Sequence, residues 1–195
     1  MTKEEVLKLF EESQALLKGH FQLSSGRHSD RYLQCALVLQ YPWYAEKLCA
    51  ALAELVKPLK PKAVVSPALG GVVVGQELAR ALGVRAIFTE RGKTDDKMEL
   101  RRGFSVAPGE RVFAVEDVIT TGKSVRESIA VIRSLGAEVV GVGSLMDRSN
   151  GLAAKDFDVP MTSLVSLEVT SWEPAQCPLC AQGTPAVKPG SRAKF

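Results

Sequence analysis

The segment from Val112 to Ser124 constrains the fold of this 195-residue chain more than any other. It begins with an apolar run typical of a buried strand and continues with the carboxylates of Glu116 and Asp117. It ends in a short turn rich in Thr and Gly, before an amphipathic helix. Ligands of open α/β sheets bind just beyond the carboxyl ends of strands. A Gly-containing turn that opens a helix suits a phosphate, and adjacent carboxylates suit hydroxyls or a divalent cation. The segment therefore predicts a site for a phosphorylated sugar.

Apolar periodicity along the rest of the chain alternates between strand-like and helix-like. The pattern predicts strands at 63–65, 85–89, 112–115 and 139–145, and helices at 42–56, 72–82 and 125–135. Such alternation predicts a doubly wound α/β domain with a parallel sheet covered on both faces. Near the N-terminus, a capping box of Thr2 and Glu5 predicts a helix whose apolar stripe runs through Leu17 and ends near Gly19. Two short strands around a polar turn are expected between residues 21 and 34.

The composition is that of an ordinary soluble globular protein, with 46% hydrophobic and 24% charged residues. The net charge of +3 offers no electrostatic argument for nucleic acid or a membrane as a partner. The first residues are acidic and unlike a signal peptide, and no apolar run approaches the ~20 residues that span a bilayer. We therefore expect a cytoplasmic protein that binds neither nucleic acid nor membrane.

The segment from Val112 to Ser124 resembles the signature of the type I phosphoribosyltransferases, which use 5-phosphoribosyl 1-pyrophosphate (PRPP). The resemblance implies that the acidic pair contacts the ribose hydroxyls and that the turn holds the 5′-phosphate. A nucleotide P-loop is excluded, because it needs a Gly five residues before Gly122, where Asp117 stands. The implied PRPP-binding residues of this segment are Glu116, Asp117, Val118, Ile119, Thr120, Thr121, Gly122, Lys123 and Ser124.

Two other loops fit the same resemblance. The turn from Pro67 to Gly71 follows the first core strand, and its paired glycines allow close approach of an anion. The resemblance implies that Leu69, Gly70 and Gly71 hold the pyrophosphate. The charged loop from Glu90 to Leu100 has no apolar periodicity and is interpreted as either a mobile lid or a solvated hairpin tip. The implied catalytic residues are Asp117 and three cations of this loop. Lys97 is the first candidate among the cations, followed by Lys93 and Arg91. Arg91 is also implied to bind PRPP.

Three features resemble the orotate phosphoribosyltransferases specifically: the segments 19–29 and 100–104, and the pair Asp147-Arg148 after a strand. The resemblance covers roughly residues 15 to 150 and implies transfer of phosphoribosyl from PRPP to orotate in pyrimidine biosynthesis, with Mg²⁺ as cofactor. It also implies a homodimer with shared active sites. The expected domain spans 1–195, with an N-terminal hood at 15–40, a core at about 42–170 and a C-terminal tail at 174–195. The implied orotate-binding residues are Thr120, Arg148, Tyr32, Leu33, Ser25 and Gly26.

The chain also departs from the bacterial pattern of that family. Ser24 and Gly70 stand where lysines are usual, and no His lies between Arg91 and Leu100. A phosphoribosyltransferase for another nucleobase therefore stays open. So does a PRPP-sensing regulator that binds nucleic acid, although such a protein would need an added binding element or a basic face.

Cys177 and Cys180 form a CxxC pair within a segment rich in Pro, Gly and small residues, which is expected to wrap the surface or to be partly mobile. One such pair supplies two of the four ligands of a structural zinc site. Cys35 and Cys49 do not form a second pair, and the flanking residues argue against a redox motif. We interpret the pair as structural or incidental, with a metal site shared across a dimer as the alternative.

Overall fold

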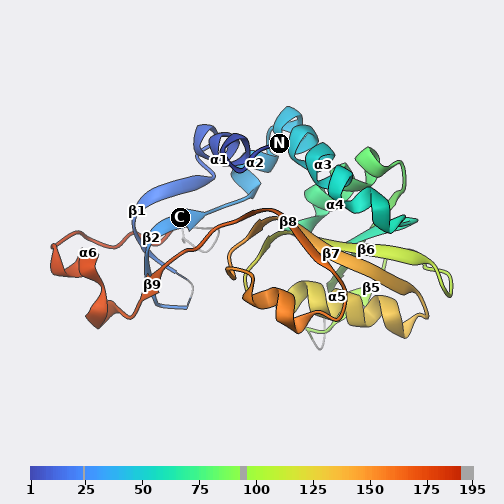
Figure 1. Ribbon diagram of the computed structural model, residues 1–195. Helices are drawn as coiled ribbons and strands as arrows, with labels where there is room; N and C mark the ends of the chain where they lie inside the picture. The colour runs from blue at the N-terminus through green and yellow to red at the C-terminus, as the bar shows by residue number, and fades with distance from the viewer. Residues whose placement is uncertain (24, 93–95, 190–195) are drawn as a thin grey trace.

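The computed structural model describes residues 1–23, 25–92 and 96–189. Its centre is a six-stranded sheet in the order β5-β4-β3-β6-β7-β8 (Figure 1). The strands β4, β3, β6, β7 and β8 pair in parallel, whereas the short β5 pairs antiparallel with β4. This arrangement confirms the predicted doubly wound parallel sheet. The strands are β3 (Ala63–Pro67), β4 (Arg85–Arg91), β5 (Met98–Leu100), β6 (Arg111–Ile119), β7 (Glu138–Asp147) and β8 (Met161–Ser166).

Helices cover both faces of this sheet. Figure 1 shows α3 and α4 on one side and α5 on the other. Alternate residues of β6 explain the two layers, because Phe113 and Val115 pack in the core beneath α3 whereas Val112 and Ala114 pack against α5, all fully buried. The helices are α1 (Lys3–Glu12), α2 (Ala36–Leu39), α3 (Pro42–Val56), α4 (Gly71–Leu82), α5 (Lys123–Ser134) and α6 (Pro178–Ala181), with short 3-10 turns η1 (Lys57–Leu59), η2 (Leu152–Asp156) and η3 (Pro174–Gln176).

A second, three-stranded sheet forms the hood, and it is built from both ends of the chain. The strands β1 (Leu16–Gln22) and β2 (His28–Leu33) form the antiparallel hairpin that the sequence predicts, and β9 (Ser171–Trp172) pairs with β2. The segment after β9 continues through η3 and α6 and returns to β1, where Val187 forms a parallel bridge with Phe21. The tail therefore projects beyond the hood at α6 and returns to it at Val187 (Figure 1).

The first helix is shorter than predicted, because it ends at Glu12 and not near Gly19. The Ser13 hydroxyl donates to a main-chain carbonyl of the preceding turn at 2.7 Å, and Gln14 adopts a left-handed conformation with φ of 57°. The chain then reverses, and Leu16 begins β1. The apolar residues that continue the helical stripe in the sequence thus belong to a strand, since two adjacent apolar residues fit either period.

The segment 90–100, expected as a polar loop that is either a mobile lid or a solvated hairpin tip, has strand residues at both of its ends. Its first two residues complete β4, and Met98 to Leu100 form β5. The main-chain N–H of Gly92 donates to the Lys97 carbonyl at 2.8 Å, which closes the hairpin up to residues 93–95, outside the described part. Three residues are too few to show strand periodicity. The strand β8 is likewise not predicted by the pattern, because only Val165 of its residues is buried.

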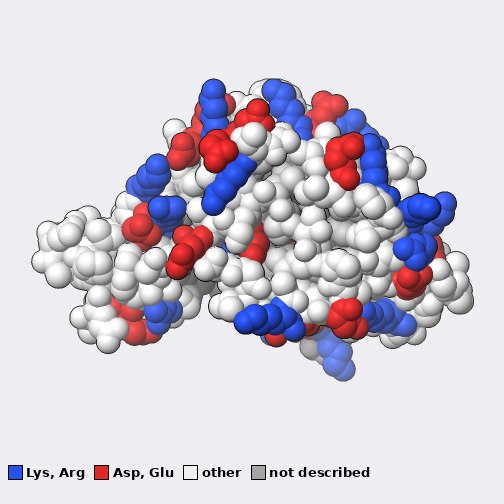
Figure 2. Space-filling view, in the orientation of Figure 1, with Lys and Arg blue, Asp and Glu red and all other residues white. Residues whose placement is uncertain are grey.

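Charges of both signs are intermixed over the face of the molecule shown in Figure 2. Many of the charged side chains at the surface form ion pairs, such as Arg85 with Glu110 and Arg111 with Glu138. Among the residues that the structure describes, no helix has the length and apolar character that a membrane span requires.

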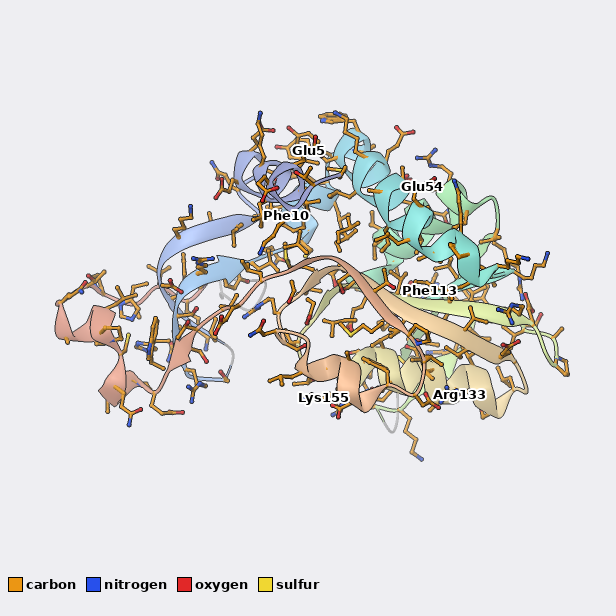
Figure 3. All side chains as sticks on the ribbon, in the orientation of Figure 1. Glu5, Phe10, Glu54, Phe113, Arg133 and Lys155 are labelled. Atoms are coloured by element: carbon orange, nitrogen blue, oxygen red, sulfur yellow. The ribbon has the colours of Figure 1, made fainter. Side chains whose placement is uncertain are left out.

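The close pairing of β6 and β7 depends on glycine. The Phe113 ring, which lies inside the molecule (Figure 3), crosses over the neighbouring strand at Gly141 and Gly143. A Cβ atom added to Gly143 would lie 2.8 Å from that ring and 2.9 Å from the main-chain oxygen of Thr162. Two neighbours, one of them backbone, would have to move.

We expect Gly143→Ala to lower the free energy of unfolding by about 1–3 kcal/mol, the usual cost of overpacking a close-packed core. Urea unfolding measures the effect. The control is Gly19→Ala in the hood, where the added Cβ would meet only the outer end of the Phe21 ring, at 3.2 Å. An equal loss in both variants would contradict this account of the β6–β7 packing.

Candidate active site

The predicted acidic pair and the predicted pyrophosphate turn are neighbours in space. Glu116 and Asp117 lie near the carboxyl end of β6, and the turn from Pro67 to Gly71 lies at the carboxyl end of the adjacent strand β3. A Cβ atom on Gly70 would lie 3.2 Å from the nearer carboxylate oxygen of Asp117. The turn contains a cis peptide bond between Ala68 and Leu69, and Gly71 begins α4.

Burial disfavours the ionised forms of the two carboxylates. It raises the pKa of Glu116 to about 7, with repulsion from Asp117 as the second cause. Burial also raises the pKa of Asp117, although the main-chain N–H of Val118 donates to this carboxylate at 2.9 Å and acts in the opposite direction. A ligand that donates hydrogen bonds or carries positive charge would stabilise the ionised forms. The pair therefore suits sugar hydroxyls or a divalent cation.

Cys35 is a neighbour of the site that sequence reasoning missed. Its thiol lies within hydrogen-bonding reach of Asp117, and it is almost completely buried. Burial, and next the charge of Asp117, raise the pKa of this thiol well above its ordinary value. The thiol therefore stays neutral and supports the carboxylate. A single cysteine just after the hairpin carries no pattern that would reveal this contact.

The predicted phosphate turn runs from Thr120 to the first residues of α5. Gly122 caps this helix in a left-handed conformation with φ of +68°, and a Cβ atom there would lie 2.8 Å from the Phe157 ring. Only glycine fits both conditions. The N-terminus of a 12-residue helix thus faces the turn, which suits an anion. Lys123 and Ser124 form the first turn of α5, and Ile119 is buried in the core on the α5 side.

Arg148 follows β7 and is held beside the phosphate turn, because its main-chain N–H donates to the Ile119 carbonyl at 2.8 Å. Its guanidinium is partly buried, and this burial lowers its pKa. The buried Nε has no hydrogen-bond partner within the described residues. The adjacent Asp147 carboxylate accepts main-chain hydrogen bonds from Ser149 and Gly151 instead, and so it organises the loop. An anionic ligand would stabilise this partly buried cation by accepting hydrogen bonds from its guanidinium.

Two cavities flank this edge of the sheet. One, of about 390 Å³, brings the phosphate turn and Arg148 together; it is lined by Thr120, Thr121, Arg126, Arg148, Ser149, Leu152, Ala153 and Asp156. The other, of about 450 Å³, lies between the end of the hood and the pyrophosphate turn; it is lined by Gln34, Ala36, Leu39, Gln40, Leu69, Gly70, Val73 and Asp117. A larger groove of about 790 Å³ runs between α1 and α3, but none of the described residues that line it is a predicted site residue.

The four hood residues predicted to bind orotate lie in three different surroundings. Tyr32 lies on β2, where its ring packs on Phe21 with ring centres 5.8 Å apart, and its electrostatic interaction with Arg148 raises the pKa of that arginine against the larger, lowering effect of burial. The Leu33 side chain is buried in the core and lines neither of the two cavities flanking the sheet edge. Ser25 and Gly26 lie at the tip of the hairpin and line neither of the two cavities flanking the sheet edge.

The predicted lid is anchored to the helix that carries the phosphate turn. The Arg91 guanidinium forms an ion pair with Glu127 of α5 at 2.5 Å and donates to the Asp96 carbonyl at 2.7 Å. Lys97 lies on the far arm of the hairpin, and Lys93 falls outside the described residues. Glu127 is a contact that sequence reasoning did not foresee, because no local pattern links a residue of α5 to the hairpin 36 residues earlier.

Comparison with known proteins decides the family. Residues 44–179 match the family model of the phosphoribosyl transferase domain. The orotate phosphoribosyltransferase of Heliobacterium modesticaldum is 55% identical over 98% of this chain and 100% of its own length. That of Caldanaerobacter subterraneus is 53% identical over 98% and 99%. The chain belongs to the orotate phosphoribosyltransferase family.

Solved structures agree with this assignment. The crystal structure of orotate phosphoribosyltransferase from Aeropyrum pernix superposes with a TM-score of 0.69 at 28% identity, over 83% of this chain and 93% of that one. The resemblance inferred from the motifs is thus confirmed, and the edge that carries Glu116, Asp117 and Arg148 is the candidate active site of an orotate phosphoribosyltransferase family member.

The raised pKa of Glu116 generates a prediction about stability. Its ordinary pKa is 4.5, and in the folded chain it is about 7. Because the folded state holds this proton more tightly than the unfolded state, the stability falls as pH rises between those two values. We expect Glu116→Gln to be more stable than the parent chain by about 2–3 kcal/mol at pH 8, with the difference vanishing towards pH 4.5.

Urea unfolding of the ligand-free protein at several pH values measures this difference. The control is Glu54→Gln, which changes an exposed carboxylate on α3 (Figure 3). A Glu116→Gln advantage that stayed constant with pH would show that desolvated charge is not its cause.

Proposed function

We propose that this chain transfers the phosphoribosyl group of PRPP to orotate, forming orotidine 5′-monophosphate and pyrophosphate in pyrimidine biosynthesis. The observation that carries the proposal is the partly buried Arg148, which lies beside the phosphate turn with an unsatisfied Nε. Orotate is a planar base with a carboxylate, and a guanidinium binds such a group through two parallel hydrogen bonds. The full-length relatives named orotate phosphoribosyltransferase support the same choice of base.

PRPP would extend along the edge of the sheet. Thr120 to Ser124 and the first amides of α5 would take the 5′-phosphate, and Glu116 and Asp117 would accept hydrogen bonds from the ribose hydroxyls. The backbone of Leu69 to Gly71 would take the pyrophosphate, because it lies against Asp117. Val118 and Ile119 connect these parts, and Ile119, whose side chain is buried in the core, would contribute through its main chain.

The base would lie over Thr120 and Arg148, with Tyr32 and the hood hairpin above it. In this arrangement the chain holds N1 of orotate against C1 of the ribose, so the reaction needs no covalent nucleophile. The hairpin cations Arg91, Lys93 and Lys97 would add positive charge near the departing pyrophosphate and help to exclude water. Arg91 would have to leave Glu127 to do so.

Magnesium fits the donor set of this site. Mg²⁺ binds through one or two carboxylates together with phosphate oxygens, and a cation beside Glu116 would offset the burial and the Asp117 charge that raise the pKa of this carboxylate. When bound, Mg²⁺ would neutralise negative charge on the leaving pyrophosphate. The carboxylates of Glu116 and Asp117 would orient the ribose that carries the pyrophosphate.

Arg148→Ala is expected to raise the KM for orotate about 10- to 100-fold, because the lost charge-assisted pair contributes about 1.5–3 kcal/mol. Pyrophosphate release with PRPP, Mg²⁺ and each nucleobase in turn measures both the effect and the choice of base. Arg133→Ala is the matched control, because this arginine lies on the outer face of α5 and pairs with Asp158 (Figure 3). Faster turnover of uracil or hypoxanthine than of orotate by the parent chain would refute the proposal.

We further propose that the active unit is a homodimer in which the hairpin of one subunit acts in the site of the other. Lys97→Ala should then lower kcat more than it weakens PRPP binding, as expected for a contact made mainly in the transition state. A mixed dimer of Lys97→Ala and Asp117→Asn subunits places both changes in one site and leaves the second intact. It should keep about half of the parent activity. A hybrid with almost no activity would mean that the hairpin acts within its own subunit.

A further inference from the structure

A group of four metal-ligating side chains lies in the hood, outside the candidate active site. His20 on β1 and His28 on β2 face Cys177 and Cys180 at the start of α6. One ligand atom from each of the four lies within 4.8 Å of all the others. These are the only two histidines of the chain and two of its four cysteines. The CxxC pair that lacked partners in the sequence therefore acquires two from the opposite end of the chain.

The distances within this group suit a tetrahedral metal ion. His20 Nε2 lies 2.9 Å from His28 Nδ1 and 3.4 Å from the Cys177 sulfur. The Cys180 sulfur lies 3.3 Å from His28 Nδ1 and 3.8 Å from His20 Nε2. Zinc binds histidine nitrogen at about 2.0–2.1 Å and thiolate sulfur at about 2.3 Å, so tetrahedral ligands are separated by about 3.3–3.8 Å. Small side-chain shifts would complete that geometry.

A further contact orients one ligand. The other ring nitrogen of His20, Nδ1, lies 2.7 Å from the carbonyl oxygen of Thr184. A carbonyl can only accept, so Nδ1 carries the proton and the Nε2 lone pair points towards the two sulfurs and His28. Histidines that bind metals commonly donate their second N–H to a carbonyl or carboxylate in this way. The three residues His20, His28 and Cys177 are also buried.

The segment that carries the cysteines has little else to hold it. Figure 1 shows α6 projecting beyond the hood, away from the central sheet. Between residues 173 and 189, Cys177 is the only buried residue among those described, and Val187 is 58% exposed although it bridges to β1. Small units that cannot bury an apolar core are commonly stabilised by a disulfide or a structural metal. All four cysteines are free thiols here.

We propose that His20 Nε2, His28 Nδ1 and the sulfurs of Cys177 and Cys180 bind one Zn²⁺ ion, which ties the C-terminal segment to the hood. Two thiolates and two imidazoles form a donor set that selects zinc. Four protein ligands leave no open coordination position, so the site is structural and takes no part in phosphoribosyl transfer. Both strands of the hairpin and the segment after β9 are thereby fixed to one point.

Metal analysis of the full chain, purified under reducing conditions and loaded with Zn²⁺, tests the proposal. We expect about one zinc ion per chain in the parent protein and in Cys49→Ala, whose cysteine is buried beneath α4. Cys180→Ser and the double variant Cys177→Ser/Cys180→Ser should retain less than about a tenth of that zinc. Cys180 is exposed, so the single variant changes no buried packing.

Cobalt substitution keeps the proposal testable even where a variant fails to fold. The parent chain loaded with Co²⁺ should show the intense visible bands of a tetrahedral ion and thiolate charge-transfer absorption. Removing the metal should speed cleavage by chymotrypsin after Leu179 about tenfold, because the segment opens locally. A parent chain that stays free of zinc, holds a Cys177–Cys180 disulfide, gives an octahedral cobalt spectrum, or loses no zinc in the double variant would overturn the proposal.

Discussion

The burial of β6 on both of its faces is the constraint on which the rest of the structure depends. Phe113 and Val115 fill one core and Val112 and Ala114 the other, so this strand cannot shift by one residue without exchanging the two sets. Glycines on β7 let the aromatic ring cross the neighbouring strand. This packing fixes where the strand ends, and hence where the acidic pair, the phosphate turn and α5 must lie.

The candidate active site holds charges that the empty fold does not favour. Glu116 has a raised pKa because it is buried beside Asp117, and Arg148 has a lowered pKa because its guanidinium is partly buried. Asp147 is adjacent to Arg148 in the sequence, and an ion pair between them would be expected. The Asp147 carboxylate instead accepts hydrogen bonds from the main chain of Ser149 and Gly151. Charges left in this state are available to a ligand that carries phosphates, hydroxyls and a carboxylate.

Much of the fold could be predicted because its strands and helices are long enough to show their period. The helix that begins at Pro42 and the helix α5 are found almost as predicted, whereas β6 runs to Ile119, four residues beyond the predicted strand, and contains the acidic pair. Predictions failed where an element is short or half-buried, as at β5 and β8, or where one residue changes the chain direction, as Gln14 does after α1. The motif residues of the site could be identified because a contiguous segment carries them. Cys35 and Glu127 could not, since each acts through a contact between distant segments.

By itself, the sequence determined the fold class and the family, and it predicts a site at the end of β6, because strand, carboxylates, turn and the start of a helix follow one another within thirteen residues. Tertiary structure alone decided which residues meet across the chain. It shows that the buried Nε of Arg148 has no hydrogen-bond partner among the described residues, that Leu33 belongs to the core, and that His20 and His28 stand next to a CxxC pair some 150 residues away. The physical reason is that local patterns report the burial of each residue, whereas the pairing of distant ones depends on how sheets and termini pack together.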